Sequence, residues 1–352
     1  MKSKLHIVAV YSTIHFIVDF ACAYLVASLI TPISSSAQSL LLAILFYNMF
    51  AFALQLPIGI IADKLNKNAL VSSLGCLLII GGFAFFKVSI LSGMMAGLGN
   101  ACFHVGGGID TLNISNKKAK LLGIYVAPGA MGLFLGGKLG SYGFNKTWLV
   151  IMILLLAAIA LLHLYSKIKN KYKINNLVPN LGKITKKHII ILSTLVLAVC
   201  VRGYLGLILN YTWKADMRVA LVFVASVVLG KVLGGFISDR FGVIKTAVVS
   251  LGASAILFLF SFNSAVIGIL AILMFNMTMP ITLIALANTF NNNKGFAFGL
   301  TTFGLFIGAI PVLLGLESVL FNPWSLLIVT AITAVILYVG LKQYKSLGVD
   351  ND

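Results

Sequence analysis

Twelve long apolar runs constrain the fold of this chain more than any other feature of its sequence. Each run is long enough to cross the ~30 Å hydrocarbon core of a bilayer as a helix of about 20 residues. A segment inside lipid must satisfy its own backbone N–H and C=O groups, and an α-helix does so. The predicted spans are residues 5–30, 38–62, 69–86, 88–111, 120–142, 147–165, 188–210, 217–238, 245–262, 264–290, 295–316 and 323–341.

Composition excludes a soluble fold. Hydrophobic residues make up 60% of the chain and charged residues only 10%, against about 25% charged in ordinary soluble domains. The first run is too long for the core of a signal peptide and no small-residue cleavage site follows it, so we interpret it as an uncleaved first span. The four cysteines lie inside apolar runs without metal-ligand spacing, and we expect no metal site and no cofactor.

The basic residues predict an orientation. The formal net charge is +18, but the lysines and arginines sit in short clusters between the apolar runs, which argues against a nucleic-acid partner. With the N-terminus inside, 19 of the 26 fall on the cytoplasmic side, 5 on the outer side, and Arg202 and Lys231 lie within spans. This asymmetry predicts a multi-pass protein of the inner (cytoplasmic) membrane with both termini in the cytoplasm.

Two halves of the chain resemble each other. A basic stretch, residues 166–187, separates residues 1–165 from residues 188–352, and we interpret it as a cytoplasmic linker that contacts anionic lipids. An offset of 176 residues pairs Gly59 with Gly235, Asp63 with Asp239, Lys64 with Arg240, Asn100 with Asn276 and Gly132 with Gly308. The predicted fold is therefore an all-α integral membrane protein of twelve transmembrane helices, in two pseudo-symmetric six-helix bundles of like orientation.

A few polar residues lie at membrane depth, where each is costly and needs a reason. The first span carries His15 and Asp19, four residues apart and so on one helical face. The corresponding polar residues of later spans are Asn100, His104, Arg202 and Asn276.

Two interpretations of these residues remain open. In one, His15 and Asp19 bind substrate or relay a proton, Arg202 attracts anionic groups, and Asp19 and Arg202 approach each other as an acid–base pair. In the other, the polar side chains only hold helices together by hydrogen bonds. Lys231, about two turns from the cytoplasmic end of its span, is expected to extend to that end.

Two loops carry a family resemblance. The segments GIIADKLNKN, from Gly59, and GFISDRFG, from Gly235, resemble the G-x-L-A-D-R-x-G-R loop of the major facilitator superfamily. Asn66 stands where the family has glycine, and asparagine tolerates the left-handed conformation that the turn requires; the second loop keeps its glycine as Gly242. The resemblance implies that Asp63-Lys64 and Asp239-Arg240, beside Gly59 and Gly235, latch a cytoplasmic gate. The alternative is that the basic residues only set topology.

Three further motifs resemble the fosmidomycin-resistance branch of that superfamily: SxxHFxxDF around His15 and Asp19, GLGNACFH ending at His104, and APGAMGLFLGGKLG from Ala127. The resemblance implies proton-coupled efflux of a small polar or anionic compound or drug, that is, antiport conferring drug resistance. Glycines of the third motif and one counterpart are expected to permit close helix packing and rocking, or packing alone: Gly129, Gly132, Gly136 and Gly308. The chain departs from the branch at Val105, at Gly137-Lys138 and at Gly93, where proline, Gly-Pro and the superfamily's arginine are expected.

The sequence thus favours a secondary transporter that works by alternating access, as a monomer, with a small molecule and the proton as partners. Uptake of a small metabolite is the alternative direction. An intramembrane enzyme and a transport-dead sensor on the same fold are the competing classes. No HExxH, GxSxG or Walker motif is present, so we expect no enzymatic activity.

Overall fold

The computed structural model describes residues 2–168, 184–290, 293–316 and 320–348, and every regular element within them is helical. Ten of these helical stretches are long and apolar enough to cross a membrane. The two other predicted spans correspond to α5 (Asn68–Ala84), a shorter apolar helix, and to α6 (Ser89–Ile114). All twelve predicted runs coincide with helical stretches, within about four residues at each end. The number of helices that cross the membrane stays a prediction.

By its internal contacts the chain forms two compact units. The first unit comprises Met1–Ile114, Pro128–Asn180 and Asn292–Phe303, and the second comprises Ser115–Ala127, Leu181–Asn291 and Gly304–Asp352. These units differ from the predicted bundles, because residues 115–127 group with the second unit and residues 292–303 with the first. The division into bundles 1–165 and 188–352 stays a prediction. Most of the predicted linker, residues 169–183, lies outside the described residues.

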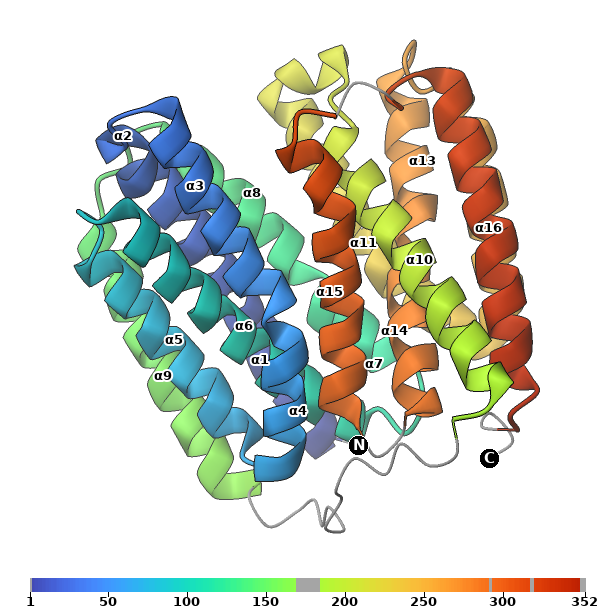
Figure 1. The fold of residues 1–352 in the computed structure, drawn as a ribbon, viewed down its shortest axis with the longest axis horizontal. Helices are drawn as coiled ribbons and strands as arrows, with labels where there is room; N and C mark the ends of the chain where they lie inside the picture. The colour runs from blue at the N-terminus through green and yellow to red at the C-terminus, as the bar shows by residue number, and fades with distance from the viewer. Residues whose placement is uncertain (1, 169–183, 291–292, 317–319, 349–352) are drawn as a thin grey trace. The chain divides into compact units, whose positions relative to one another are not determined.

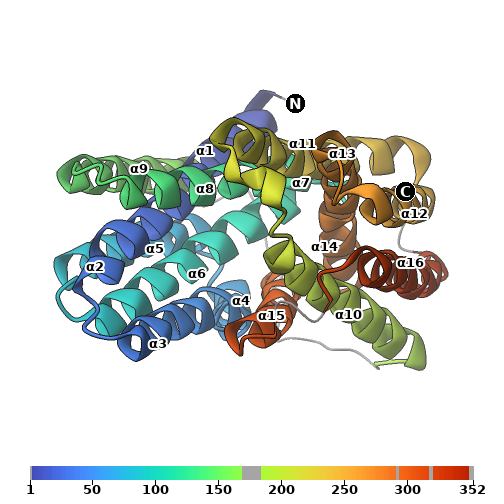
Figure 2. The ribbon, with the colours of Figure 1, turned by 90° about the horizontal axis from the view of Figure 1, so that it is seen from above.

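The first unit contains the helices of the first half of the chain except α7. Helix α1 packs along α8, α5 contacts both α6 and α9, and α3 packs on α6 (Figures 1 and 2). Their bounds are α1 Lys2–Leu25, α2 Thr31–Ile33, α3 Ala37–Asn48, α4 Gln55–Leu65, α8 Pro128–Ser141 and α9 Thr147–Ile168. π-Helical turns at Val26–Ile30 and Met49–Ala53 join α1 to α2 and precede α4.

The second unit holds the remaining helices. Helix α16 contacts α10 and α12, and α11 contacts α7 and α13 (Figures 1 and 2). Helix α15 begins in the first unit and ends in the second. The bounds are α7 Lys120–Val126, α10 Lys186–Ile208, η3 Thr212–Ala215, α11 Met217–Phe241, α12 Val243–Phe260, α13 Ala265–Asn276, α14 Thr278–Thr289, α15 Lys294–Leu313 and α16 Pro323–Lys345.

Local sequence explains several helix ends. The side chains of Asp216 and Asn322 accept hydrogen bonds from backbone N–H groups in the first turns of α11 and α16, which satisfies donors that the helix leaves without partners. At the other end, Asn66 terminates α4 in the left-handed region with φ 49°. The expectation that asparagine replaces glycine in this turn is confirmed. Gly242 ends α11 with φ 90°.

The described helices expose apolar side chains and enclose polar ones. Large apolar residues such as Leu156, Val266 and Val335 are more than half exposed. His15 and Asp19 are each only 5% exposed, within the first unit. Because lipid disfavours polar groups and is indifferent to apolar ones, this is the distribution expected of a protein surrounded by lipid.

Candidate functional site

Helix α1 places His15 and Asp19 on the side that packs against other helices of the first unit. The spacing of four residues brings their side chains together, and His15 Nε2 lies 3.2 Å from Asp19 Oδ2. The predicted shared face is therefore confirmed, and the pair is buried rather than turned to lipid.

Helix α6 adds two more predicted residues to this pair. Asn100 Nδ2 donates to Asp19 Oδ1 at 2.9 Å. His104 Nε2 lies 2.8 Å from His15 Nε2 and 3.6 Å from Asp19 Oδ1. Four residues from two helices thus form one buried cluster, which we call the His–Asp cluster: His15, Asp19, Asn100 and His104.

The hydrogen bonds fix one tautomer in the His–Asp cluster. His104 Nδ1 lies 2.8 Å from the carbonyl oxygen of Asn100, and a carbonyl only accepts, so Nδ1 must carry a hydrogen. The two facing Nε2 atoms then share one hydrogen between them. Asn100 orients both His104, through its carbonyl, and Asp19, through its amide.

Glycines of α8 let that helix approach α1 closely. A side chain at Gly132 would overlap the backbone of Phe16 and Phe20, and one at Gly136 would overlap that of Phe20. A side chain at Gly129 would instead overlap Asp19 Oδ2 and His15 Nε2. Gly129 was predicted only as a packing residue, but it packs directly against the His–Asp cluster.

A second buried network lies further along α6, at Asp110, about two turns after His104. Asp110 accepts hydrogen bonds from the hydroxyl of Tyr11, at 2.6 Å, and from Nδ2 of Asn68, at 2.8 Å. Sequence reasoning missed Tyr11 and Asn68, since a tyrosine or an asparagine near the end of an apolar run is unremarkable by itself. This network joins α1, α5 and α6 through buried hydrogen bonds.

Asp63, at the end of α4, caps the start of α15. Its two carboxylate oxygens accept hydrogen bonds from the backbone N–H groups of Gly295, at 2.8 Å, and Phe296, at 2.9 Å. Gly59 packs directly on the backbone of Gly295. A carboxylate at a helix N-terminus is stabilised by the helix dipole and by the unpaired N–H groups. Lys64 is exposed.

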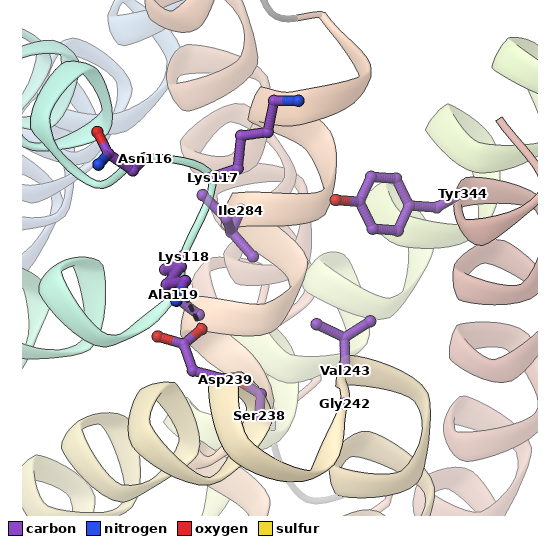
Figure 3. A pocket seen from close by; sticks show the side chains of 10 residues that line it. All are labelled: Asn116, Lys117, Lys118, Ala119, Ser238, Asp239, Gly242, Val243, Ile284 and Tyr344. Atoms are coloured by element: carbon purple, nitrogen blue, oxygen red, sulfur yellow. Dashed lines mark hydrogen bonds between the residues drawn. The ribbon is translucent and has the colours of Figure 1, made fainter. Parts of the chain in front are cut away.

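Asp239 makes the equivalent contacts in the second unit. It accepts from the N–H groups of Ala119, at 2.7 Å, and Lys120, at 3.1 Å, where α7 begins. Gly235 packs on Ala119. Asp239 is one of the residues that line a cavity of about 240 Å³, and its carboxylate is turned toward Ala119 (Figure 3). Arg240 is exposed and lies over the ring of Phe241.

The predicted offset of 176 residues matches both the two acids and their hydrogen-bond partners. It carries Ala119 and Lys120, the partners of Asp239, onto Gly295 and Phe296, the partners of Asp63. The acids therefore make the helix-end contacts that the resemblance implies, and the neighbouring bases make none with them among the described contacts. The role of Gly59, Asp63, Lys64, Gly235, Asp239 and Arg240 in gating stays a prediction.

We expect amide hydrogen exchange to show that Asp63 protects the start of α15 and that Asp239 protects the start of α7. Asp63→Asn removes the charge that holds the first amides of α15, and a hydrogen bond to a charged group contributes about 1.5–3 kcal/mol. Amides at the start of α15 should then exchange about tenfold faster or more. Those at the start of α7 should respond to Asp239→Asn instead. The matched control Lys64→Gln should change neither, and an unchanged rate at α15 in Asp63→Asn would contradict the capping role.

Arg202 and Asn276, the remaining predicted binding residues, belong to the second unit. Arg202 is 8% exposed, and its Nη1 donates to Thr282 Oγ1 at 3.0 Å. In the described part of the chain its Nη2 has no hydrogen-bond partner. Asn276 donates to Ile272 O in its own helix. The predicted pairing of Asp19 with Arg202 stays a prediction, because the two residues lie in different units.

Gly308 and Lys231 also belong to the second unit. Gly308 packs on the backbone of α10 at Cys200 and Tyr204, as predicted for a packing glycine. The expectation that Lys231 extends to the end of its span is wrong. Lys231 is 9% exposed, and its Nζ donates to Val126 O at 3.2 Å. Val126 is the last residue of α7, and the last carbonyls of a helix have no partner within it.

Solved structures identify the fold. The E. coli fucose:proton symporter matches with a TM-score of 0.67 at 14% identity, over 97% of this chain and 99% of that chain. A bacterial homologue of the iron transporter ferroportin matches with a TM-score of 0.62 at 11% identity, over 98% and 99%. The human organic anion transporter MFSD10 matches with a TM-score of 0.67 at 12% identity, over 97% and 99%.

The chain has the fold of the major facilitator superfamily. The prediction of an all-α membrane fold of this kind is confirmed, and the proteins that share it are described as transporters. No protein-family model and no curated protein sequence matches the chain. The resemblance to the fosmidomycin-resistance branch stays a prediction.

Proposed function

We propose that the chain is a secondary active transporter that exports a small polar or anionic compound or drug by alternating access, driven by the proton gradient across the cytoplasmic membrane. The fold supports transport, since a fucose:proton symporter and an organic anion transporter share it. We propose that both termini face the cytoplasm and that the Asp63 and Asp239 caps close the cytoplasmic end.

The observation that carries this proposal is the His–Asp cluster. Its polar atoms converge inside an otherwise apolar set of helices, at a free-energy cost that helix packing alone does not require. Asp19 and His15 are nearly enclosed, whereas the side chain of His104 is 13% exposed. A substrate or an ion can therefore reach the enclosed cluster at the side chain of His104. We assign the binding of substrate and ion to this cluster.

Arg202 supports an anionic substrate. Its guanidinium is buried, is held by Thr282, and keeps Nη2 available in the described part of the chain. A planar guanidinium matches the oxygens of carboxylate and phosphonate groups. Substitution of Arg202 is therefore expected to affect anionic compounds more than neutral ones.

A growth screen tests the proposal. The chain is expressed in a bacterial strain without its own major drug exporters, and a panel of drugs and phosphonates is applied. We expect the wild type to raise the inhibitory concentration of at least one anionic compound about fourfold or more, and Arg202→Gln to abolish this protection. Arg218→Gln, at an exposed helix start, serves as the matched control.

Increased sensitivity would instead indicate uptake, the second candidate, which the symporter of the same fold favours. Unchanged growth and accumulation for every compound would contradict both.

A further inference from the structure

Three side chains of the first unit present potential metal-ligand atoms to one another. His15, Asp19 and His104 each offer one atom, and these atoms all lie within 4.8 Å of one another. The sequence predicts no metal site, because the cysteines lack metal-ligand spacing. We propose that these three residues bind one divalent first-row transition metal ion, such as Zn²⁺ or Fe²⁺.

The distances suit a single ion. Ligand atoms that lie about 2.0–2.1 Å from a metal, at angles between octahedral and tetrahedral, are about 2.9–3.4 Å apart. The His15 and His104 Nε2 atoms are separated by 2.8 Å. Asp19 oxygens lie 3.2 Å from His15 Nε2 and 3.6 Å from His104 Nε2. These three separations span the expected range, so an ion bound among the atoms requires movements of only a few tenths of an ångström.

Asn100 supplies the outer contacts that metal-binding histidines and carboxylates usually have. A metal-ligating histidine donates its other ring N–H to a carbonyl or carboxylate, and His104 Nδ1 donates to Asn100 O at 2.8 Å. The Asn100 amide holds Asp19 Oδ1 at 2.9 Å, so that Oδ2 faces His15. The arrangement directs Nε2 of His104 toward the same point as the Asp19 carboxylate.

Gly129 lets the two ligand side chains of α1 lie directly against α8. A side chain at this position would overlap both His15 Nε2 and Asp19 Oδ2. Every other residue type would push these atoms aside. Gly129→Ala is therefore expected to disturb the ligand geometry and to weaken binding of the ion.

The donor set selects the class of ion. Two imidazole nitrogens and one carboxylate suit zinc and non-haem iron, with open positions left for water or another ligand. Mg²⁺ prefers oxygen ligands and retains several waters, so we expect it not to compete. This inference deepens the proposed function by naming an ion for the same site. The binding of the ion is independent of the proposed function, and only a use of the bound ion in transport rests on that function.

Binding is measured on the purified, tag-free full chain in detergent, stripped with chelator and titrated with Co²⁺, a visible-light reporter for zinc sites. We expect one Co²⁺ per chain, displaced by Zn²⁺ and not by Mg²⁺. His15→Ala and His104→Ala should each weaken binding about 100-fold or more. Asn100→Ala should weaken it about 10- to 100-fold, as loss of an outer contact does. His104→Cys should retain binding, because a thiolate is also a ligand.

His163→Ala, at an exposed histidine of α9, is the control and should bind as the wild type does. The wild type also gives a measurement independent of variant folding, since Zn²⁺ and not Mg²⁺ should raise its unfolding temperature. Equal Co²⁺ binding by the wild type and a His15→Ala, His104→Ala double variant would overturn the proposal, as would a wild type that binds no Co²⁺. Transport without metal binding would overturn only the metal site, and metal binding without transport would overturn only the proposed function.

Discussion

Replacing Asp19 with asparagine is expected to reduce export about 30-fold or more while the chain remains folded. The carboxylate is buried, receives the Asn100 amide and lies beside both imidazoles. Removing one partner of a buried, hydrogen-bonded charge pair costs about 2–5 kcal/mol in protein–protein interfaces, and 1.4 kcal/mol is a factor of ten. Asparagine keeps the size of the side chain, so the helices should still pack.

Export is measured as the rate at which loaded cells lose a compound identified by the growth screen, at matched amounts of protein in the membrane. Asp216→Asn, the same change at an exposed helix cap, is the control and should export at the wild-type rate. Export by Asp19→Asn at the wild-type rate would remove the His–Asp cluster from the mechanism and leave it a packing feature.

The second large effect is expected at Gly132. A leucine there would overlap the backbone of Phe16 and Phe20, and backbone cannot yield as a side-chain end can. Overpacking of a close contact costs about 1–3 kcal/mol and occasionally more. Because this contact joins α8 to α1, which carries His15 and Asp19, we expect Gly132→Leu to lower the unfolding temperature sharply and to abolish export.

Gly137 provides a matched control in the same helix. A side chain at Gly137 would meet nothing within 4 Å, and leucine has a higher helix propensity than glycine. Gly137→Leu should therefore unfold at or above the wild-type temperature in detergent. Equal stability of Gly132→Leu and Gly137→Leu would show that α1 and α8 do not depend on their close approach.

Much of the fold was predictable because lipid imposes a simple rule on sequence. Each predicted apolar run coincides with a helical stretch within about four residues, since a spanning helix must be apolar over nearly its whole length. The run that became α6 contains the polar residues Asn100, His104 and Asp110, yet α6 is one unbroken helix. Its polar residues face the interior of the first unit, where they find partners.

The candidate site was predictable only in part. The spacing of His15 and Asp19 on one helix determines their contact, whereas no spacing rule joins them to Asn100 and His104 on α6. The contact of Gly129 with the cluster was also missed, because a glycine has no side chain to indicate its neighbours. Likewise, the partners of Asp63 are backbone N–H groups, which leave no mark in the sequence.

The repeat itself is less uniform than a single offset suggests. Gly132 meets α1 at Phe16 and Phe20, and its counterpart Gly308 meets α10 at Cys200 and Tyr204, so these first helices correspond at an offset of 184. A fixed offset of 176 therefore misaligns α1 with α10. At the corrected offset Gly203 corresponds to Asp19, and the second half has no acid at that position. The His–Asp cluster is thus a feature of the first half alone.

Flux through the purified chain in proteoliposomes, under an imposed pH gradient, tests the central claim most directly. For a compound found by the growth screen, we predict net movement across the membrane in the direction opposite to that in which the gradient drives protons. That movement should stop when the gradient is collapsed and in Asp19→Asn. Absence of flux in vesicles whose protein is folded, or chemical turnover of the compound without movement across the membrane, would contradict the account.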